Sequence, residues 1–365
     1  MSLLKDIYSV SFYNKLADSL IQLNPEFNKK RFIELINVEG FSAMELKQRM
    51  HHTTLVIHQF LPSAYPQAIQ HLSSLIAQLK KQQTGEQMLA YIFLPDYIET
   101  YGLEDYETSI PAIESVTQFI SCEFAIRPFL TKYGKQMMQQ MEKWSLHENH
   151  HVRRLASEGS RSRLPWAMAV PGLKKDPSMI LPILENLKND PSEYVRRSVA
   201  NSLNDISKDH PEIVIAIAGR WKGLSKETDA IIKHGCRGLL KQGHTQILAH
   251  YGLESTAIEL VNFEILTATV AIGESLEFTI SVKNTATVQQ KIRLEYAVYY
   301  KRLNGTASKK VFKISEREFQ PAEIAVISRK QSFKIITTRK FYPGAQQLAI
   351  ILNGRESELK DFELN

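Results

Sequence analysis

The sequence is poor in cysteine and has no long apolar run. Its 365 residues include only two cysteines, Cys122 and Cys236, whose separation fits reduced core residues of an intracellular protein. No apolar segment approaches the roughly 18 residues of a membrane span, and the first residues lack the basic flank and apolar core of a signal peptide. A glycine-rich phosphate loop, a paired CxxC and a Ser/His/Asp motif are also missing. We therefore expect a soluble, cytoplasmic protein with no membrane partner and no cofactor.

Positive charge is in excess, and it is unevenly distributed. The formal net charge is +6 at pH 7. By segment it is about −4 over residues 1–130, about +7 over 131–253 and about +3 over 254–365. A basic middle region favours a polyanionic partner, most simply a nucleic acid. Many basic proteins bind no DNA, so the charge alone leaves the partner open.

The basic region contains an internal repeat. Residues 151–154, HVRR, match residues 194–197, YVRR, 43 positions later, and a weaker third copy begins at Ile232. A period of about 40 to 47 residues with two helices per unit is the spacing of HEAT-type repeats. Such helix pairs cannot cover their own apolar faces, so they must stack into a solenoid. Apolar residues at helical spacing also run through residues 1–90, and we expect a HEAT-like α-helical solenoid over residues 1–253.

After residue 253 the apolar spacing alternates, as it does in strands. Phe278, Ile280 and Val282 have polar neighbours, and Asn304-Gly305 predicts a hairpin turn. Strands are predicted at 259–267, 275–284, 291–302, 310–315, 324–332 and 346–352. These runs predict an all-β, immunoglobulin-like sandwich over residues 258–365. The whole chain is thus predicted to be mainly α, with a C-terminal β domain.

The helix expected after Pro191 carries the clearest candidate working surface. One side of it is aliphatic, and the other has polar residues at helical spacing: Arg197, Asn201, Asn204, Asp205 and Lys208. Burial explains the aliphatic side but not a mixture of Arg, Asn and Asp. Because the repeats align, Arg154, Glu158 and Arg161 should lie beside this surface. In each Arg pair we expect one member to be structural, through an acid such as Asp190, and the other to be exposed to phosphates.

Residues 147–151, HENHH, spell the H-E-x-x-H zinc motif. That chemistry needs both histidines on one stable helix, facing a third ligand. The 43-residue repeat instead aligns this segment with the turn at 190–194. A polar turn between helices is therefore the better interpretation, and no metal site is expected.

Several isolated residues have both a structural and a functional interpretation. Residues 109–130 predict one helix, in which the carboxylate of Glu123 would usually face solvent and, if buried, would need a partner. The acidic residues between 96 and 107 are interpreted as a solvated helix end. Trp166 follows a basic segment and is either a packing anchor or a residue that faces a base or sugar. Trp144 and Trp221 are predicted to be core residues.

Three segments resemble a known family. Residues 152–167, VRRLASEGSRSRLPWA, and 190–211, DPSEYVRRSVANSLNDISKDHP, are similar to signature blocks of the AlkC branch of HEAT-like-repeat alkylpurine-DNA glycosylases. Residues 121–130, SCEFAIRPFL, resemble a third block, and the C-terminal sandwich resembles that of part of the branch. The resemblance implies hydrolysis of the N-glycosidic bond of cationic N3-alkylated bases, 3-methyladenine or 3-methylcytosine, in double-stranded DNA. It implies no deep base flipping, and we expect a monomer in the bacterial cytosol or nucleoid.

The resemblance also implies roles for individual residues. Asp205 matches the principal catalytic carboxylate, Glu158 and Glu123 match two further acids, and Trp166 matches the aromatic residue at the lesion. A cationic base leaves without a strong general acid, so carboxylates would stabilise the oxocarbenium-like sugar and orient water. The residues expected to bind DNA are Arg154, Arg161, Arg163, Arg197, Lys208, Lys233 and Arg237. The alternative is a non-catalytic HEAT-repeat scaffold that binds DNA or protein.

Overall fold

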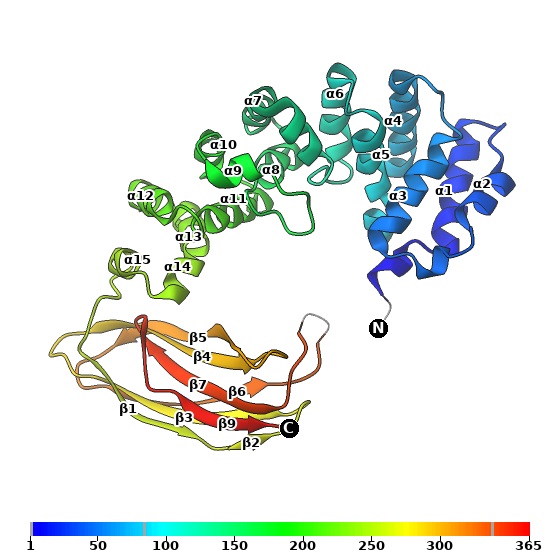
Figure 1. Cartoon of the computed structure of the whole chain (residues 1–365). Helices are drawn as coiled ribbons and strands as arrows, with labels where there is room; N and C mark the ends of the chain where they lie inside the picture. The colour runs from blue at the N-terminus through cyan, green and yellow to red at the C-terminus, as the bar shows by residue number, and fades with distance from the viewer. Residues whose placement is uncertain (1–2, 83–84, 337–338) are drawn as a thin grey trace. The chain divides into compact units, whose positions relative to one another are not determined.

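A computed structural model describes residues 3–82, 85–336 and 339–365 (Figure 1). The chain divides into two compact units, residues 1–210 with 221–235, and residues 211–220 with 236–365. The α-helices are α1 (Val10–Leu23), α2 (Lys29–Ile36), α3 (Leu46–His58), α4 (Tyr65–Lys81), α5 (Phe93–Tyr101), α6 (Tyr106–Thr117), α7 (Ile126–Trp144), α8 (His150–Gly159), α9 (Pro171–Lys175), α10 (Leu181–Leu187), α11 (Glu193–Ile206), α12 (Pro211–Trp221), α13 (Lys226–Gly235), α14 (Arg237–Gln242) and α15 (Thr245–His250). Short 3₁₀ helices are η1 (Leu4–Ile7), η2 (Phe41–Ala43) and η3 (Gly85–Ile92).

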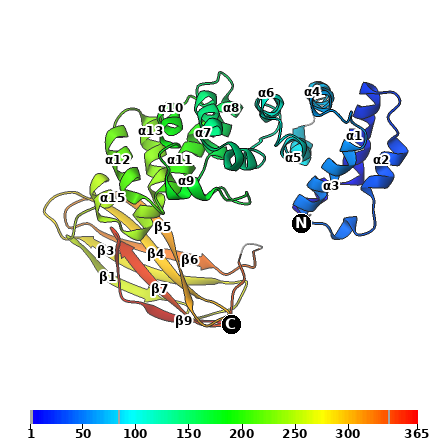
Figure 2. The ribbon, with the colours of Figure 1, turned by 45° about the horizontal axis from the view of Figure 1, so that its top comes forward.

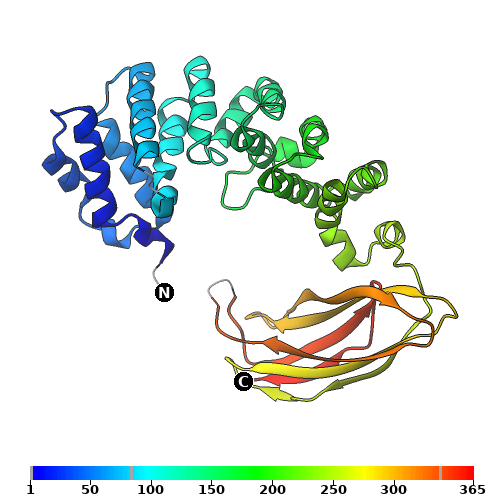
Figure 3. The same ribbon diagram turned by 180° about the vertical axis from the view of Figure 1, so that it is seen from behind.

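The helices of the first unit form where apolar residues recur at helical spacing. In α1 the Ser9 hydroxyl caps the first turn by accepting the backbone N–H of Phe12 at 3.2 Å, and Phe12 and Leu16 are buried. Helices α8 and α11 each begin one residue before the HVRR and YVRR segments, so the two copies of the repeat start at the same point. Helix α11 packs against both α8 and α13. Along this unit the colour runs from blue at the first helices, α1 to α3, to green at α7 and α8 (Figures 2 and 3).

The predicted single helix over residues 109–130 is wrong. Helix α6 ends at Thr117 and α7 begins at Ile126, and a turn joins them. The turn is held from inside, because the Thr117 hydroxyl accepts the backbone N–H of Cys122 at 3.4 Å and the Cys122 thiol lies 3.7 Å from the Ile113 carbonyl oxygen. Phe119 and Cys122 are buried although they lie outside a helix, which is why the apolar pattern resembled a continuous helix.

The second unit contains all the described strands. They are β1 (Ile258–Ile265), β2 (Thr269–Val270), β3 (Ser275–Asn284), β4 (Gln290–Lys301), β5 (Ala307–Phe319), β6 (Ile324–Ser332), β7 (Gly344–Leu352), β8 (Arg355–Glu356) and β9 (Lys360–Leu364). A three-stranded sheet has the order β1-β3-β6. A six-stranded sheet has the order β2-β9-β7-β4-β5, with β8 paired to β7.

The core of this unit comes from alternate residues of the strands, as the sequence predicted. Phe278 and Ile280 of β3 are buried with Tyr296 and Val298 of β4. The rings of Phe278 and Tyr296 meet edge to face with centroids 5.1 Å apart. Gly305 turns the predicted hairpin between β4 and β5 with a φ of 77°. Strand β9 was not predicted, because charged residues alternate along it with the few that reach the core.

Candidate active site

The three carboxylates singled out in the sequence belong to one series of alternating acidic and basic side chains in the first unit. Glu158 lies in the last turn of α8, and Asp205 lies near the end of α11, which packs against α8. Glu123 lies in the turn between α6 and α7. The repeat therefore predicted correctly that α8 and α11 bring Glu158 and Asp205 together.

Arg161 connects Glu158 to Asp205. Its Nη1 donates to Glu158 Oε1 at 2.6 Å, and its Nε and Nη2 each lie 2.7 Å from Asp205 Oδ2. Lys208 Nζ lies 3.0 Å from Asp205 Oδ1. The Asp205 side chain is only 3% exposed, so its carboxylate is almost enclosed by these two cations.

The surroundings keep Arg161 charged. Burial is the largest influence and lowers the pKa of Arg161, but the hydrogen bonds from Arg161 to Asp205 and Glu158 and the charges of both acids outweigh it. The net result is a pKa of Arg161 above its usual range. The guanidinium of Arg161 gives both buried carboxylates a charged hydrogen-bond partner, without which their burial would be costly.

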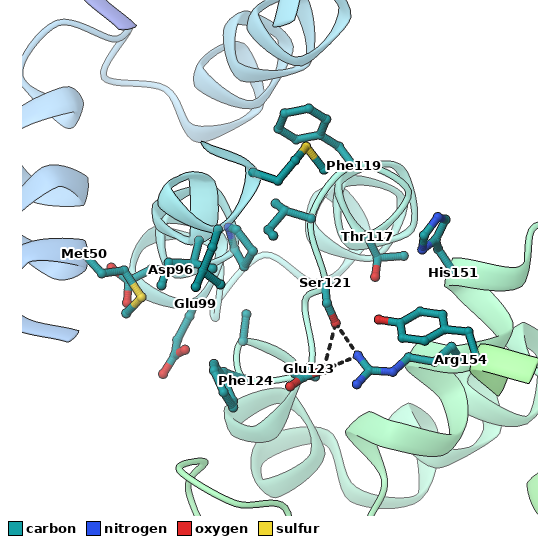
Figure 4. Close-up of a pocket in the computed structure, with 17 residues that line it drawn as sticks. Met50, Asp96, Glu99, Thr117, Phe119, Ser121, Glu123, Phe124, His151 and Arg154 are labelled. Carbon is teal, nitrogen blue, oxygen red and sulfur yellow. Dashed lines mark hydrogen bonds and ion pairs between the residues drawn. The ribbon is translucent and has the colours of Figure 1, made fainter. Parts of the chain in front are cut away.

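Arg154 connects Glu123 to the same series. Its guanidinium donates to Glu123 and, at 2.9 Å, to the Ser121 hydroxyl (Figure 4). Its Nη2 also lies 3.6 Å from Glu158 Oε1. The Tyr194 ring packs on the guanidinium with its centroid 4.8 Å away. Glu123 is thus largely covered and paired, and it does not face solvent as an isolated carboxylate in that stretch usually would.

A pocket of about 390 Å³ opens beside Glu123 and Arg154 (Figure 4). Its walls are mostly apolar, and two acids of α5, Asp96 and Glu99, also line it. Asp96 is buried and lies 3.0 Å from His51 Nδ1, and burial followed by the charge of Asp96 raises the pKa of Glu99 to about 7. The interpretation of this acidic segment as a solvated helix end is therefore wrong for Asp96 and Glu99, because α5 packs against α3.

Trp166 lies in the loop between α8 and α9, residues 160–170, and the residue is 74% exposed. Its φ of 63° is in the left-handed region, which is unusual for a bulky residue. Lys47 of α3 donates to its main-chain oxygen. Trp166 is therefore not a packing anchor, whereas Trp144 and Trp221 are buried as predicted.

The paired arginines divide as the sequence predicted in one repeat only. Arg153 is structural and donates to Asp190 Oδ2 at 2.6 Å, and Arg196 donates to the Asp190 carbonyl oxygen at 2.7 Å. Arg197 is exposed, as expected. Arg154 was expected to be exposed too, and this is wrong. It forms an ion pair with Glu123, whose largely covered carboxylate needs a partner.

The remaining residues predicted to bind DNA lie on different elements of the chain. Arg163 pairs with Asp209 at 2.7 Å, and Lys208 keeps 46% of its side chain exposed while it contacts Asp205. Lys233 is half-buried on α13, and Arg237 begins α14 in the second unit. Contact of these residues with phosphates stays a prediction, as it does for Arg154, Arg161 and Arg197.

The H-E-x-x-H segment forms the polar turn that the repeat predicted. Helix α8 begins at His150, and the Asn149 side chain caps it by accepting the backbone N–H of His151 at 2.8 Å. His147 precedes the helix, so His147 and His151 do not share a helical face. Within the described ranges, no group of three or more His, Cys, Asp and Glu side chains is arranged to hold a metal ion.

Sequence reasoning missed Ser121 and Tyr194, which position Arg154. Each could have been found from its position in the sequence. Ser121 is two residues before Glu123, and Tyr194 aligns with His151 in the 43-residue repeat. It also missed Lys47, because nothing in the local sequence of α3 indicates a contact with residue 166.

Comparison with known proteins defines the class of this chain. The family model described as DNA alkylation repair enzyme matches residues 49–220. The model described as the C-terminal Ig-like domain of uncharacterised protein YhaZ matches residues 259–365. The chain therefore combines a helical DNA alkylation repair region with an immunoglobulin-like domain.

Two full-length relatives give the family. The chain is 43% identical over 365 residues to the uncharacterized protein YhaZ of Bacillus subtilis (strain 168), with 100% of both chains covered. It is 34% identical to the Pseudomonas fluorescens alkylpurine DNA glycosylase AlkC, solved bound to DNA containing an abasic site analog, with a TM-score of 0.94 and 100% of both chains covered. The chain belongs to the AlkC branch of the DNA alkylation repair family.

Proposed function

We propose that the protein is a DNA glycosylase that hydrolyses the N-glycosidic bond of cationic N3-alkylated bases, such as 3-methyladenine and 3-methylcytosine, in double-stranded DNA. The observation that carries this proposal is the series of buried, paired charges that joins Glu123, Glu158 and Asp205 in one site. The likeness to AlkC supports it, since that protein was solved with an abasic site analog and an abasic site is what base removal leaves in DNA.

The arrangement suits a reaction in which the leaving group is already cationic. The base needs no strong general acid, and the developing oxocarbenium-like sugar needs negative charge near C1′. Arg161 occupies Asp205 Oδ2, whereas Oδ1 contacts the half-exposed Lys208. Asp205 Oδ1 is therefore the atom that would orient a water and accept its proton. Glu158 and Glu123 would add negative charge, and the exposed Trp166 would pack against the deoxyribose.

The finer features of the proposal concern the whole chain. We assign residues 1–253 to a HEAT-like solenoid that binds DNA and holds the catalytic carboxylates, and residues 258–365 to the immunoglobulin-like domain. The protein would act as a monomer in the bacterial cytoplasm, and it would probe the lesion without extruding the base into a deep pocket. The match of the Ig-like family model to residues 259–365 supports the second assignment.

A non-catalytic scaffold that binds DNA or protein is the competing function. One observation favours it: Asp205 is almost fully covered and its charge is balanced by Arg161 and Lys208, as in a purely structural ion cluster. A scaffold would keep this cluster for stability alone and would release no base.

The test is to incubate the purified protein with methylated double-stranded DNA and identify the freed bases by chromatography. We expect release of 3-methyladenine at the same rate with and without a chelator. Binding of the DNA without release of any methylated base would contradict the glycosylase and favour the scaffold.

A further inference from the structure

Arg127, in the first turn of α7, is a fully buried guanidinium. It donates from Nη1 to the carbonyl oxygens of Gly159 at 2.8 Å and Arg161 at 2.7 Å, and from Nε to the carbonyl oxygen of Met168 at 2.9 Å. Within the described residues, no carboxylate forms an ion pair with it, unlike Arg154 and Arg161. All its hydrogen bonds thus go to the main chain at the two ends of one loop.

That loop, residues 160–170, carries Trp166 and supplies Arg161 to the carboxylates. Its own backbone bonds are few and long, such as the 3.4 Å contact from the Ala167 N–H to the Leu164 oxygen. Yet it holds Trp166 in the left-handed region with an exposed indole. A bulky residue keeps such a conformation only where its surroundings impose it. The three carbonyl contacts of Arg127 hold both ends of this loop, and Lys47 contacts the main-chain oxygen of Trp166 between them.

Burying a charged guanidinium is costly, so Arg127 is not expected at this position if its only role is to fill space. Burial, and then the neighbouring positive charge of Arg161, lower the pKa of Arg127 to about 10. A methionine would fill a similar volume without bringing a charge into the interior. The guanidinium fork is the group that can reach several carbonyl oxygens at once.

We propose that Arg127 is the positioning residue of the active-site loop. It fixes the Gly159, Arg161 and Met168 carbonyls, and it thereby sets where Trp166 and the Arg161 side chain stand relative to Asp205. The catalytic part of this inference rests on the proposed glycosylase function, whereas the structural part, that the loop is held by Arg127, does not.

The experiment compares Arg127→Met and Arg127→Lys with the unmodified protein in two measurements. Brief trypsin digestion reports the loop directly, because Arg161 and Arg163 are cleavage sites inside it. Single-turnover release of 3-methyladenine, with DNA affinity measured in parallel, reports the chemistry. Arg196→Met is the matched control, since Arg196 also donates to two main-chain oxygens, those of Asp190 and Pro191, but at the start of α11.

We expect both Arg127 variants to be cut after Arg161 or Arg163 on the order of tenfold faster, with other sites unchanged. Base release should fall by about 100-fold while DNA affinity stays within about threefold, because displacement of a site by about 1 Å has that effect. Arg196→Met should change neither loop cleavage nor base release.

Unchanged cleavage of the loop in both Arg127 variants would overturn the proposal. Faster cleavage throughout the first unit in both variants would overturn it too, because Arg127 would then support the whole unit rather than the loop. If the unmodified protein releases no base, the glycosylase function fails, yet the cleavage pattern still decides whether Arg127 holds the loop.

Discussion

Arg161 shows how two carboxylates can be buried side by side. Glu158 and Asp205 share one planar guanidinium, whose donors lie 2.6 and 2.7 Å from their oxygens. A buried acid without a partner is strongly destabilising, and Arg161 pairs with two acids here, together with Lys208 at Asp205 and Arg154 at Glu158. The same residue therefore links stability of the first unit to the geometry of the proposed site.

Replacing Arg161 by methionine should lower the free energy of unfolding by about 3–5 kcal/mol, the effect of breaking a buried ion pair. The matched control is Arg163→Met, which removes the more exposed pair with Asp209 and should lower it by about 1 kcal/mol or less. Urea unfolding of the two variants is the measurement. Equal losses of unfolding free energy in the two variants would show that the buried ion pairs of Arg161 stabilise the protein no more than the exposed pair of Arg163 does.

Glu99 makes a second prediction at this scale. Burial and the charge of Asp96 raise the pKa of Glu99 from 4.5 to about 7, while the charges of Lys47 and His51 oppose the shift. The folded protein therefore holds this proton more tightly than the unfolded chain, and the free energy of unfolding falls as pH rises from 4.5 to 7. In Glu99→Gln this side chain no longer titrates, so its part of the fall in stability with rising pH is removed.

Urea unfolding of Glu99→Gln and the unmodified protein at pH 4 and pH 8 tests this sign. We expect the variant to gain stability relative to the unmodified protein on going from the lower to the higher pH. A difference between the two proteins that does not change with pH would mean that Glu99 titrates as an exposed acid does.

At the scale of the element, the sequence predicted the helices better than the turns. The aliphatic stripe of α11 predicted its buried face and, through the 43-residue repeat, its pairing with α8. The turn at 118–125 was not predicted, because its buried Phe119 and Cys122 continue an apolar pattern that helices share. Glu123 owes its position to that turn, so its burial could not be predicted either.

Gly235 allows the close approach of α13 to α11. A Cβ at this residue would lie 2.8 Å from the Leu203 Cβ, an atom next to the backbone that cannot easily move away. Gly235→Ala should therefore lower the free energy of unfolding by about 1–3 kcal/mol. Thermal or urea unfolding measures it.

The control for this prediction is Gly219→Ala in α12. An added Cβ there meets no atom within 4 Å, and alanine favours a helix over glycine by about 1 kcal/mol. The control should be neutral or stabilising. Stabilisation by both substitutions would show that α13 and α11 are not tightly packed at Gly235.

At the scale of the whole molecule, the sequence predicted a helical region followed by a β domain, but not which basic residues pair with buried acids. The change from helical to alternating spacing near residue 253 predicted that the strands follow the helices, and strand β1 begins at Ile258. The positive charge of residues 131–253 favoured a polyanionic partner. The structure shows that part of this charge balances buried acids, since Arg153, Arg154 and Arg161 all pair with carboxylates. Net charge could not reveal this, because pairing depends on which residues the fold brings together.

The most direct test of the account is the single-turnover release of 3-methyladenine from methylated double-stranded DNA by Asp205→Asn. Asn keeps the shape of Asp205 but removes its charge, so release should fall by about 10²–10³-fold while DNA affinity is retained. Asp209→Asn, which frees Arg163 nearby, should release the base at close to the unmodified rate. Release by Asp205→Asn at the unmodified rate would remove Asp205 from the mechanism and contradict the proposed site.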